Sequence, residues 1–473
     1  MRDESRLGEI GSRGRLQPSG FGAAARGLLV FARLGVVLLL PGTALGAQSV
    51  LDDYVAQGLR HNLGLRQQDL TLRSSEAAVR EARGAFLPSA TVNARYTEVG
   101  GQTVDFGQFI NPAYAALNGL LGTPAFPTDI SVRLPLKQET SVRVAQPIFQ
   151  PQVMAGYRTA SALRDVSDAT RRAAARDVIA GVRSSYLQHV KAVHLVEVRA
   201  ATRALVEEHT RVVTALVSAG RATPDAVSRV RAELSEAKQR EAEAAQLVLA
   251  TSQHFNLLIG RALTDSIVLV GAAELEPGAL PPLGDVLAES SGREEVRAVS
   301  AARRAALAQQ RAARGSFLPT VAVALDYGVQ GNEYRFSRDA DFTAVSVLAS
   351  WSLFNGGRDA SRVQQARLAA DRLEIQGEEV ERGIELQVRL AWQSSAVAFD
   401  AIGTAGEQLA AATRTHELVR RRTEEGLATA LELSEARVQL TAATLNDLIT
   451  RFDYYIRRVE LDRAAALAGE ITR

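Results

Sequence analysis

The feature that most constrains this chain of 473 residues is an internal repeat. Three short segments have a counterpart later in the chain, in the same order: RGAFLPS at 83–89 and RGSFLPT at 314–320, QPIF at 146–149 and WSLF at 351–354, AGRAT at 219–223 and EGLAT at 425–429. Three ordered matches indicate a tandem duplication. We predict a first repeat at 48–262, a linker at 263–283 and a second repeat at 284–473. The first repeat has an insertion at 98–139, rich in Gly, Pro and Asn, which predicts a loop.

Each half has the same predicted order of elements: helix, strand, loop, strand, very long helix, turn and long helix. Residues 51–86 and 284–317 have helical composition, and a proline soon after each ends the helix. Residues 155–218 and 359–424 contain no proline, and each predicts a helix of about 95 Å at 1.5 Å per residue. The last helix carries a seven-residue apolar repeat typical of coiled coils, at Leu431, Val438, Leu445, Phe452 and Val459.

Between the helices of each half, apolar residues alternate with small or polar ones, which predicts strands with two unlike faces. A water-soluble sheet with one face on a core would give this pattern, and so would a transmembrane β-barrel. The neighbouring segments offer no apolar layer to cover the strands, which favours the barrel. We therefore predict that these residues face the membrane: Val92, Tyr96, Val142, Val144, Val323, Leu325, Tyr327, Val345, Val347 and Trp351.

Only four such strands are found, and even small barrels need about eight. Open sheet edges are not tolerated in lipid, so a membrane location requires several copies of the chain to close one barrel. The alternative is a soluble intramolecular helical bundle with a small sheet, which the seven-residue repeat alone does not exclude.

The first 47 residues differ in character from the rest of the chain. Arginines precede a short apolar run at 34–40, and small residues follow it, which predicts an export signal peptide at 1–47. A membrane anchor is the alternative, but Arg33 interrupts the run, which is far shorter than the roughly 20 residues needed to span a bilayer. The chain has no cysteine, which excludes disulfides, zinc–thiolate sites, thiol nucleophiles and a lipid-bearing N-terminal cysteine. A formal charge of +2 does not indicate a nucleic-acid-binding protein.

Taken together, these segments resemble the TolC-like outer-membrane efflux proteins. The resemblance rests on the signal peptide, the duplicated body, the FLPS and FLPT junctions, the strand pairs ending at 146–149 and 353–357, and the Gly-x-Ala-Thr turns. Further similar segments are GLRHN at 58–62, FNLLIG at 255–260 and GREEVR at 292–297. No single motif is diagnostic, but their order covers essentially the whole mature chain.

The resemblance implies a mainly α fold with a small β part. Long helical hairpins would form a periplasmic α-barrel, and four strands per protomer would form a 12-stranded transmembrane β-barrel in a homotrimer. It implies a passive channel of a tripartite efflux or type I secretion system, located in the outer membrane of a Gram-negative bacterium. Its partners would be a periplasmic adaptor protein, an inner-membrane transporter and outer-membrane lipid. The alternative function is a soluble periplasmic coiled-coil scaffold.

The resemblance also assigns candidate sites. The adaptor would contact the two hairpin tips, at Gly220, Arg221, Ala222 and Thr223 and at Gly426, Leu427, Ala428 and Thr429. Glu432 and Glu435 would line the pore constriction, since they are three apart on one helix face. Such a ring of carboxylates favours cations. Both could instead be ordinary acids at a helix N-terminus. Some relatives have a basic residue two positions after the tip glycine, where this chain has Ala428.

No catalytic motif is present in the sequence. The six histidines are scattered, and no nucleophile elbow, phosphate-binding loop or dinucleotide fingerprint occurs. We predict a protein that is not an enzyme and that has no cofactor or catalytic metal.

Overall fold

The computed structural model describes residues 44–98, 100, 104–131, 133–134, 136–269, 278–331 and 340–467, which belong to one unit spanning Thr43–Arg473. The predicted signal peptide lies outside these residues except for its last four positions, and part of the predicted linker also lies outside them. No helix among the described residues is both long enough and apolar enough to cross a membrane.

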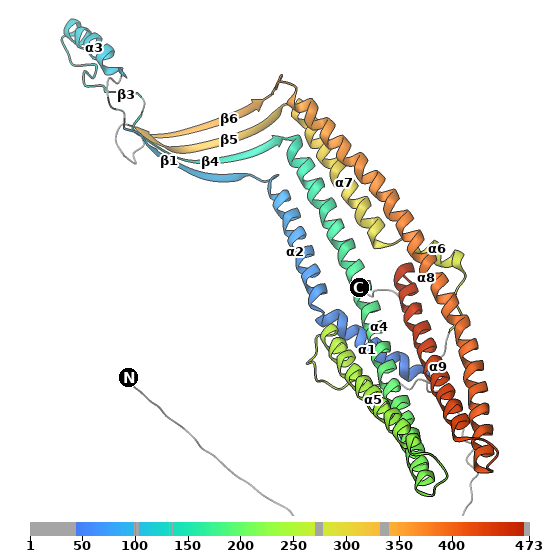
Figure 1. Cartoon of the computed structure of the whole chain (residues 1–473). Helices are drawn as coiled ribbons and strands as arrows, with labels where there is room; N and C mark the ends of the chain where they lie inside the picture. Colours follow the sequence, from blue (N-terminus) through green and yellow to red (C-terminus); the bar gives the residue numbers. More distant parts are fainter. Residues whose placement is uncertain are drawn as a thin grey trace, which may run out of the picture. The chain divides into compact units, whose positions relative to one another are not determined.

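Four antiparallel strands form the main sheet, in the order β1 (Ser89–Tyr96), β4 (Gln138–Phe149), β5 (Thr320–Gly331) and β6 (Asp341–Ser350). Each half of the chain contributes two neighbouring strands, and β4 and β5 join the halves at the centre of the sheet (Figure 1). A separate two-stranded ribbon pairs β2 (Val104–Asp105) with β3 (Arg133–Leu134).

The helices repeat in the same way. The first half has α1 (Ala44–His61), α2 (Leu63–Gly84), α4 (Pro151–Ser218) and α5 (Pro224–Leu258). The second half has α6 (Leu283–Ser290), α7 (Glu294–Arg314), a short 3₁₀ turn η2 (Gly315–Phe317), α8 (Arg358–Glu424) and α9 (Ala430–Ala465). The predicted fold class is confirmed: the chain is mostly helical with a small four-stranded sheet.

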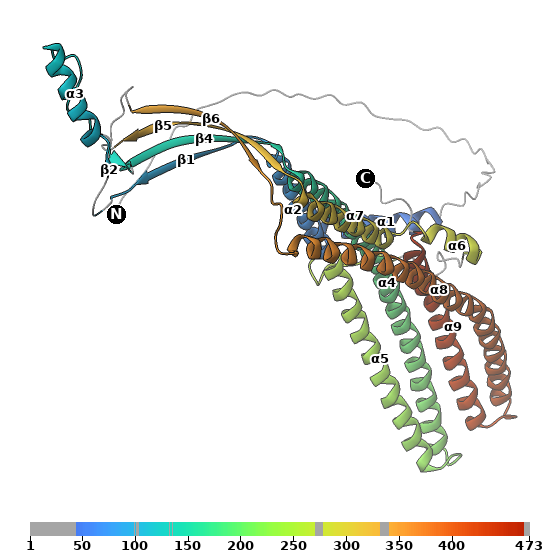
Figure 2. The same cartoon turned by 90° about the horizontal axis from the view of Figure 1, so that it is seen from above.

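Helix packing follows the order of the strands. α2 packs on α4, α4 on α7, and α7 on α8, while β1, β4, β5 and β6 are the strands joined to these four helices in turn. α4 and α5 form one hairpin and α8 and α9 the other, and α9 also packs on α4 (Figures 1 and 2). The chain is therefore a layer with β1 and α2 at one edge and β6 and α8 at the other.

The first helix of each half is interrupted, which the sequence analysis missed. Asn62 has an extended backbone and its side chain accepts a hydrogen bond from the Leu65 N–H at 3.0 Å, so it ends α1 and caps α2. Its Nδ2 also donates to the Leu258 carbonyl at 3.0 Å, which ties this break to the end of α5. In the second half, residues 291–293 separate α6 from α7.

The main core lies where α1, α4, α5 and α9 meet. It is built on buried aromatic and aliphatic side chains, which include Tyr54, Val182, Tyr186, Phe255, Ile259 and Phe452. The Tyr186 hydroxyl donates to the Val268 carbonyl, and the Tyr54 hydroxyl accepts from the Val268 N–H, so both buried hydroxyls are satisfied. A second core cluster joins α6, α8 and α9 around Val286, Val388 and Leu461.

The loop predicted at 98–139 is wrong over part of its length, because it contains α3 (Gly107–Leu121). Two glycines lie between β6 and α8. Gly356 and Gly357 have φ values of 60° and 77°, a left-handed backbone that glycine adopts without strain.

Candidate functional site

The strand residues predicted to face the membrane share one face of the sheet. The register of the strands places Val92 opposite Val142, and Val142 opposite Tyr327. A neighbouring row aligns Val144, Leu325 and Val345, and Val323 lies opposite Val347. Tyr96 lies on the same face of β1, because it is an even number of residues from Val92. The four strands thus combine into one surface, which we call the apolar face.

Trp351 is the exception among these residues. It was predicted to lie in a strand, but β6 ends at Ser350 and Trp351 follows it. Its indole N–H donates to the Phe317 carbonyl at 3.0 Å, and its ring remains largely exposed. This bond holds the tryptophan at the end of the sheet that adjoins the helices.

The side chains of the apolar face are largely exposed. Val92, Val345 and Val347 are each 72% exposed, and Tyr327 is 56% exposed. On the opposite face of β5, Ala324 is 1% and Asp326 7% exposed. A water-soluble sheet buries its apolar face and exposes its polar one. In this sheet no described helix or strand covers the apolar face, which leaves a continuous apolar surface exposed.

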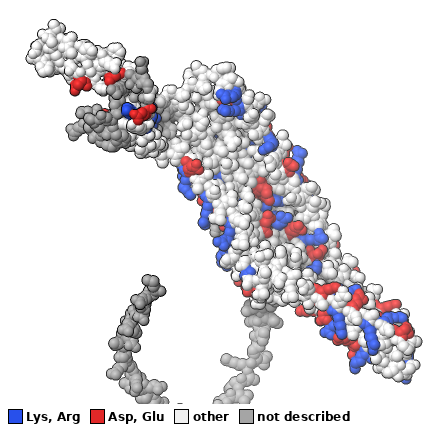
Figure 3. Space-filling view, turned by 60° about the vertical axis from the view of Figure 1, so that its left-hand side comes forward, with Lys and Arg blue, Asp and Glu red and all other residues white. Residues whose placement is uncertain are grey.

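The opposite face, which we call the polar face, carries charges in pairs. Arg143 lies directly across from Asp326, and two hydrogen bonds join them at 2.7 and 3.1 Å. Arg95 similarly pairs with Glu139 across β1 and β4 at 2.7 Å. Figure 3 shows that, on the face drawn, charged side chains are frequent over the helices and sparse over the sheet.

Both outer strands of the sheet have an open edge. β1 pairs only with β4, and β6 pairs only with β5, among the residues that the structure describes. Exposed strand edges present unpaired N–H and C=O groups, which readily accept another strand.

The two hairpin tips have the same local design. Gly220 and Gly426 have φ values of 72° and 76°, and each lies just after the end of a long helix. Thr223 and Thr429 then stand at the N-cap positions of α5 and α9. The repeated Gly-x-Ala-Thr segments therefore reverse the chain in both halves by the same geometry. Arg221, Ala222, Leu427 and Ala428 occupy the turns between these glycines and threonines.

Glu432 has a structural role at the second tip. It forms a capping box with Thr429, whose N–H donates to the carboxylate at 2.6 Å, while the Glu432 N–H donates to the threonine hydroxyl at 3.2 Å. The hydrogen bond from the Thr429 backbone, followed by that from its hydroxyl, lowers the pKa of Glu432. Glu435 lies nearly one turn further along α9, and both carboxylates are exposed in the protomer.

The sequence analysis missed a buried ion pair between the two hairpins. Arg437 of α9 is buried, and its Nη2 donates to a carboxylate oxygen of Glu233 on α5 at 2.7 Å. These residues line a groove of about 230 Å³ between the hairpins. Burial, followed by the charge of Arg437, lowers the pKa of His209 on α4. No local sequence signal pointed to this pair, because Glu233 lies 204 positions before Arg437 in the chain.

A second buried charge cluster joins α4 to the start of α7. Arg176 bonds Glu294 and Glu295, each at 2.5 Å, and Arg293 donates to Glu295 at 2.6 Å. Burial raises the pKa of Glu295, but the hydrogen bond from Arg293, its own backbone bond and the two arginine charges lower it to about 2 overall. The charged segment noted at 292–297 is therefore a packing element between helices.

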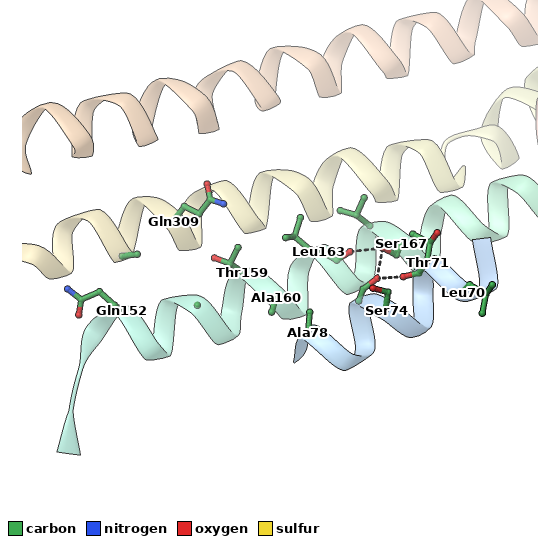
Figure 4. Close-up of a pocket in the computed structure, with 14 residues that line it drawn as sticks. Leu70, Thr71, Ser74, Ala78, Gln152, Thr159, Ala160, Leu163, Ser167 and Gln309 are labelled. Atoms are coloured by element: carbon green, nitrogen blue, oxygen red, sulfur yellow. Dashed lines mark hydrogen bonds between the residues drawn. The ribbon is translucent and has the colours of Figure 1, made fainter. Parts of the chain in front are cut away.

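A wide groove lies on α4 between α2 and α7 (Figure 4). Its volume is about 870 Å³, and none of its lining residues is titratable. The Ser75 hydroxyl donates to that of Ser167 at 2.7 Å, which ties α2 to α4 at the wall of the groove. The groove offers no acid, base or nucleophilic thiol.

Comparison with known protein families gives a match in the second half of the chain. A family model described as outer membrane efflux protein matches residues 289–467. These residues are similar to outer membrane efflux proteins, and the predicted resemblance to the TolC-like family is confirmed. No curated protein matches the chain.

Solved structures share the whole fold at low sequence identity. The Campylobacter jejuni CmeC outer membrane channel is 15% identical, with 89% of this chain and 87% of that chain covered and a TM-score of 0.74. The open state of the Neisseria gonorrhoeae MtrE outer membrane channel is 19% identical, with 88% of each chain covered and a TM-score of 0.71. The outer membrane protein VceC from Vibrio cholerae is 16% identical, with 89% and 98% covered and a TM-score of 0.72.

Proposed function

We propose that this protein is the outer-membrane channel of an efflux or secretion system, formed by three copies of the chain. The observation that carries the proposal is the uncovered apolar face of the sheet. In water, exposure of that face is unfavourable by roughly 25 cal/mol per Å². In a bilayer the same face is solvated by lipid, and the polar face turns toward a water-filled lumen.

Closure of the sheet requires other copies. In the trimer, β1 of one protomer pairs with β6 of the next, which gives a barrel of 12 strands and leaves no open edge in lipid. α2 and α8 lie at the matching edges of the helical layer, so the same symmetry continues the helices into a cylinder. The match to outer membrane efflux proteins and the fold of the CmeC, MtrE and VceC channels support this arrangement.

The channel conducts without chemistry. The polar face carries paired charges, and the groove on α4 has no titratable lining, so neither supplies a catalytic group. Energy comes from an inner-membrane transporter, and a periplasmic adaptor contacts the tips at 220–223 and 426–429. Glu432 and Glu435 of three copies form the constriction, where their charges favour cations.

The test uses a matched pair of substitutions in β6. Val347 lies on the apolar face and its neighbour Ser346 on the polar face. An arginine facing lipid near the middle of a barrel costs about 2–4 kcal/mol, whereas one facing the lumen costs little. Val347→Arg should therefore lower the temperature at which the trimer dissociates on an unheated denaturing gel, and Ser346→Arg should not.

The same samples separate the proposal from a soluble periplasmic scaffold. The channel remains with outer-membrane fractions after a salt wash and migrates as a trimer without heating. Release by salt as a monomer, with equal stability of both variants, would favour the scaffold and reject the channel.

A further inference from the structure

The insertion between β1 and β4 contains an uncharged helical unit. Residues 106–128 include no Asp, Glu, Lys or Arg. Within this stretch, α3 exposes large apolar side chains, which include Phe109, Leu117, Leu120 and Leu121. No other described helix or strand packs extensively on α3, and Figures 1 and 2 both draw it clear of the other helices.

The side of α3 that carries its asparagines is bound to the returning chain. Asn111 exchanges two hydrogen bonds with the Ile130 backbone, at 2.7 and 3.0 Å. Asn118, two turns later, exchanges two with the Phe126 backbone, at 2.7 and 2.8 Å. At Gly107 a Cβ would lie 1.8 Å from the Ile130 carbonyl oxygen, so only glycine fits there. These contacts make α3 and the segment after it one folded unit.

Among the residues that the structure describes, no other helix or strand covers the opposite side of α3. Phe109, Ala113, Ala116 and Leu120 follow the 3.6-residue period and form a stripe roughly opposite the two asparagines. The stripe combines large side chains with alanines, which allow close approach of another helix. We call it the α3 stripe. An exposed apolar surface of this kind on a folded unit indicates an interaction surface.

Charged residues separate this unit from the apolar face of the sheet. Lys137 pairs with Glu98 at 3.2 Å, where the insertion leaves and rejoins the sheet. Asp105 accepts a hydrogen bond from the Gly107 N–H at the start of α3. Charged side chains are strongly disfavoured within the hydrocarbon region, so the lipid-facing surface ends before α3 begins. This argues that another protein surface, rather than lipid, covers the α3 stripe.

We propose that the α3 stripe packs against the α3 helices of the other two copies at the rim of the barrel. This rests on the proposed trimer, in which symmetry attaches three identical insertions to one rim. A barrel of 12 strands with the usual spacing and tilt is about 24 Å wide, and a helix of 15 residues is about 22 Å long. Three α3 helices can therefore meet across the opening. Because none of the three carries a charge, their contact buries no unpaired ion.

The absence of native cysteine makes a direct test possible. Leu120→Cys places the only thiol of the chain on the α3 stripe, and Ala115→Cys places it on the same helix outside the stripe. Under mild oxidation of the purified trimer, Leu120→Cys should lose most of its monomer band to a disulfide-linked dimer on a heated, non-reducing gel. Ala115→Cys should remain monomeric under the same conditions.

Two other results would overturn the proposal. In liposomes, a bimane label on Leu120→Cys that is quenched by lipid-attached quenchers, without dimer formation, would assign the stripe to the membrane. A thiol that neither cross-links nor is quenched would leave the stripe in water. The unheated gel distinguishes these failures from failure of the proposed function. If the trimer persists, only the proposed α3 contact is wrong. If the protein migrates as a monomer, both the channel and the α3 contact are wrong.

Discussion

At the scale of single residues, polar side chains decide where helices begin and how they join. Asn62 caps α2 and donates a hydrogen bond to the end of α5, and Thr429 caps α9. Glu295 accepts hydrogen bonds from Arg176 of α4 and from Arg293 at the start of α7. Each role depends on a specific hydrogen bond. A substitution that removes this bond but nearly keeps the size of the side chain therefore tests the role of the bond.

Loss of the second tip's cap should loosen the start of α9. Thr429→Ala removes the hydroxyl that accepts from Glu432, and loss of an N-cap costs about 1 kcal/mol, or roughly fivefold in local opening. Amide hydrogen exchange in the first turn of α9 should accelerate accordingly. Thr429→Ser keeps the hydroxyl and should exchange at the native rate; equal acceleration in both variants would contradict a capping role.

Glu295 should contribute to acid sensitivity. Its pKa is lowered from an ordinary 4.5 to about 2 in the folded protein. The stability that the ionised Glu295 gives to the folded protein is therefore present in full above pH 4.5 and is lost as the pH falls through about 2. Between these values the melting temperature of the native protein should fall more steeply than that of Glu295→Gln, which cannot titrate. Parallel curves would assign the acid sensitivity to other carboxylates.

At the scale of elements, α4 and α9 join the two hairpins. α4 and α9 pack along their length, and Arg437–Glu233 extends the contact to α5. A buried arginine that loses its carboxylate keeps the cost of burial without compensation.

Glu233→Gln should therefore detach the tip regions from each other. Removing one partner of a buried pair costs about 3–5 kcal/mol, and partial exposure of Glu233 places the effect at the lower end. Hydrogen exchange should rise in α5 and α9 on the tip side of the pair. Glu236→Gln, one turn from Glu233 in an exposed pair with Arg240, is the control and should change little. A similar rise in hydrogen exchange in both variants would show that the Arg437–Glu233 pair does not hold the tip regions together.

At the scale of the whole molecule, the proposed trimer gives single exposed residues a collective effect. One Glu435 is an ordinary solvated carboxylate, whereas three around a narrow opening create a field that selects cations.

Charge reversal at this position should change ion selectivity in planar-bilayer recordings. Glu435→Lys should shift the reversal potential in a salt gradient toward anion preference, and it leaves the capping box of Glu432 intact. Glu385→Lys, on α8 far along the chain from the tip, should leave the reversal potential unchanged. An unchanged potential for Glu435→Lys would exclude this residue from the constriction.

Much of this protein is determined by local sequence. The repeated segments predicted the duplicated order of elements, and the alternation within each strand predicted which of its residues share a face, because side chains alternate along any strand. The Gly and Thr of each tip likewise act within a few residues. The resemblance to the TolC-like family followed from the order of these local signals, and the family match confirms it.

Other features exist only because distant parts of the chain meet. The helix of the insertion depends on asparagines that bond a segment folded back on it, and Arg437 meets a carboxylate 204 positions away. The apolar residues of the four strands form one face because β4 of the first half pairs in register with β5 of the second half. Local sequence fixes backbone preferences and side-chain alternation, but these contacts were decided by tertiary packing, since their energy arises only when the folded chain brings the partners together.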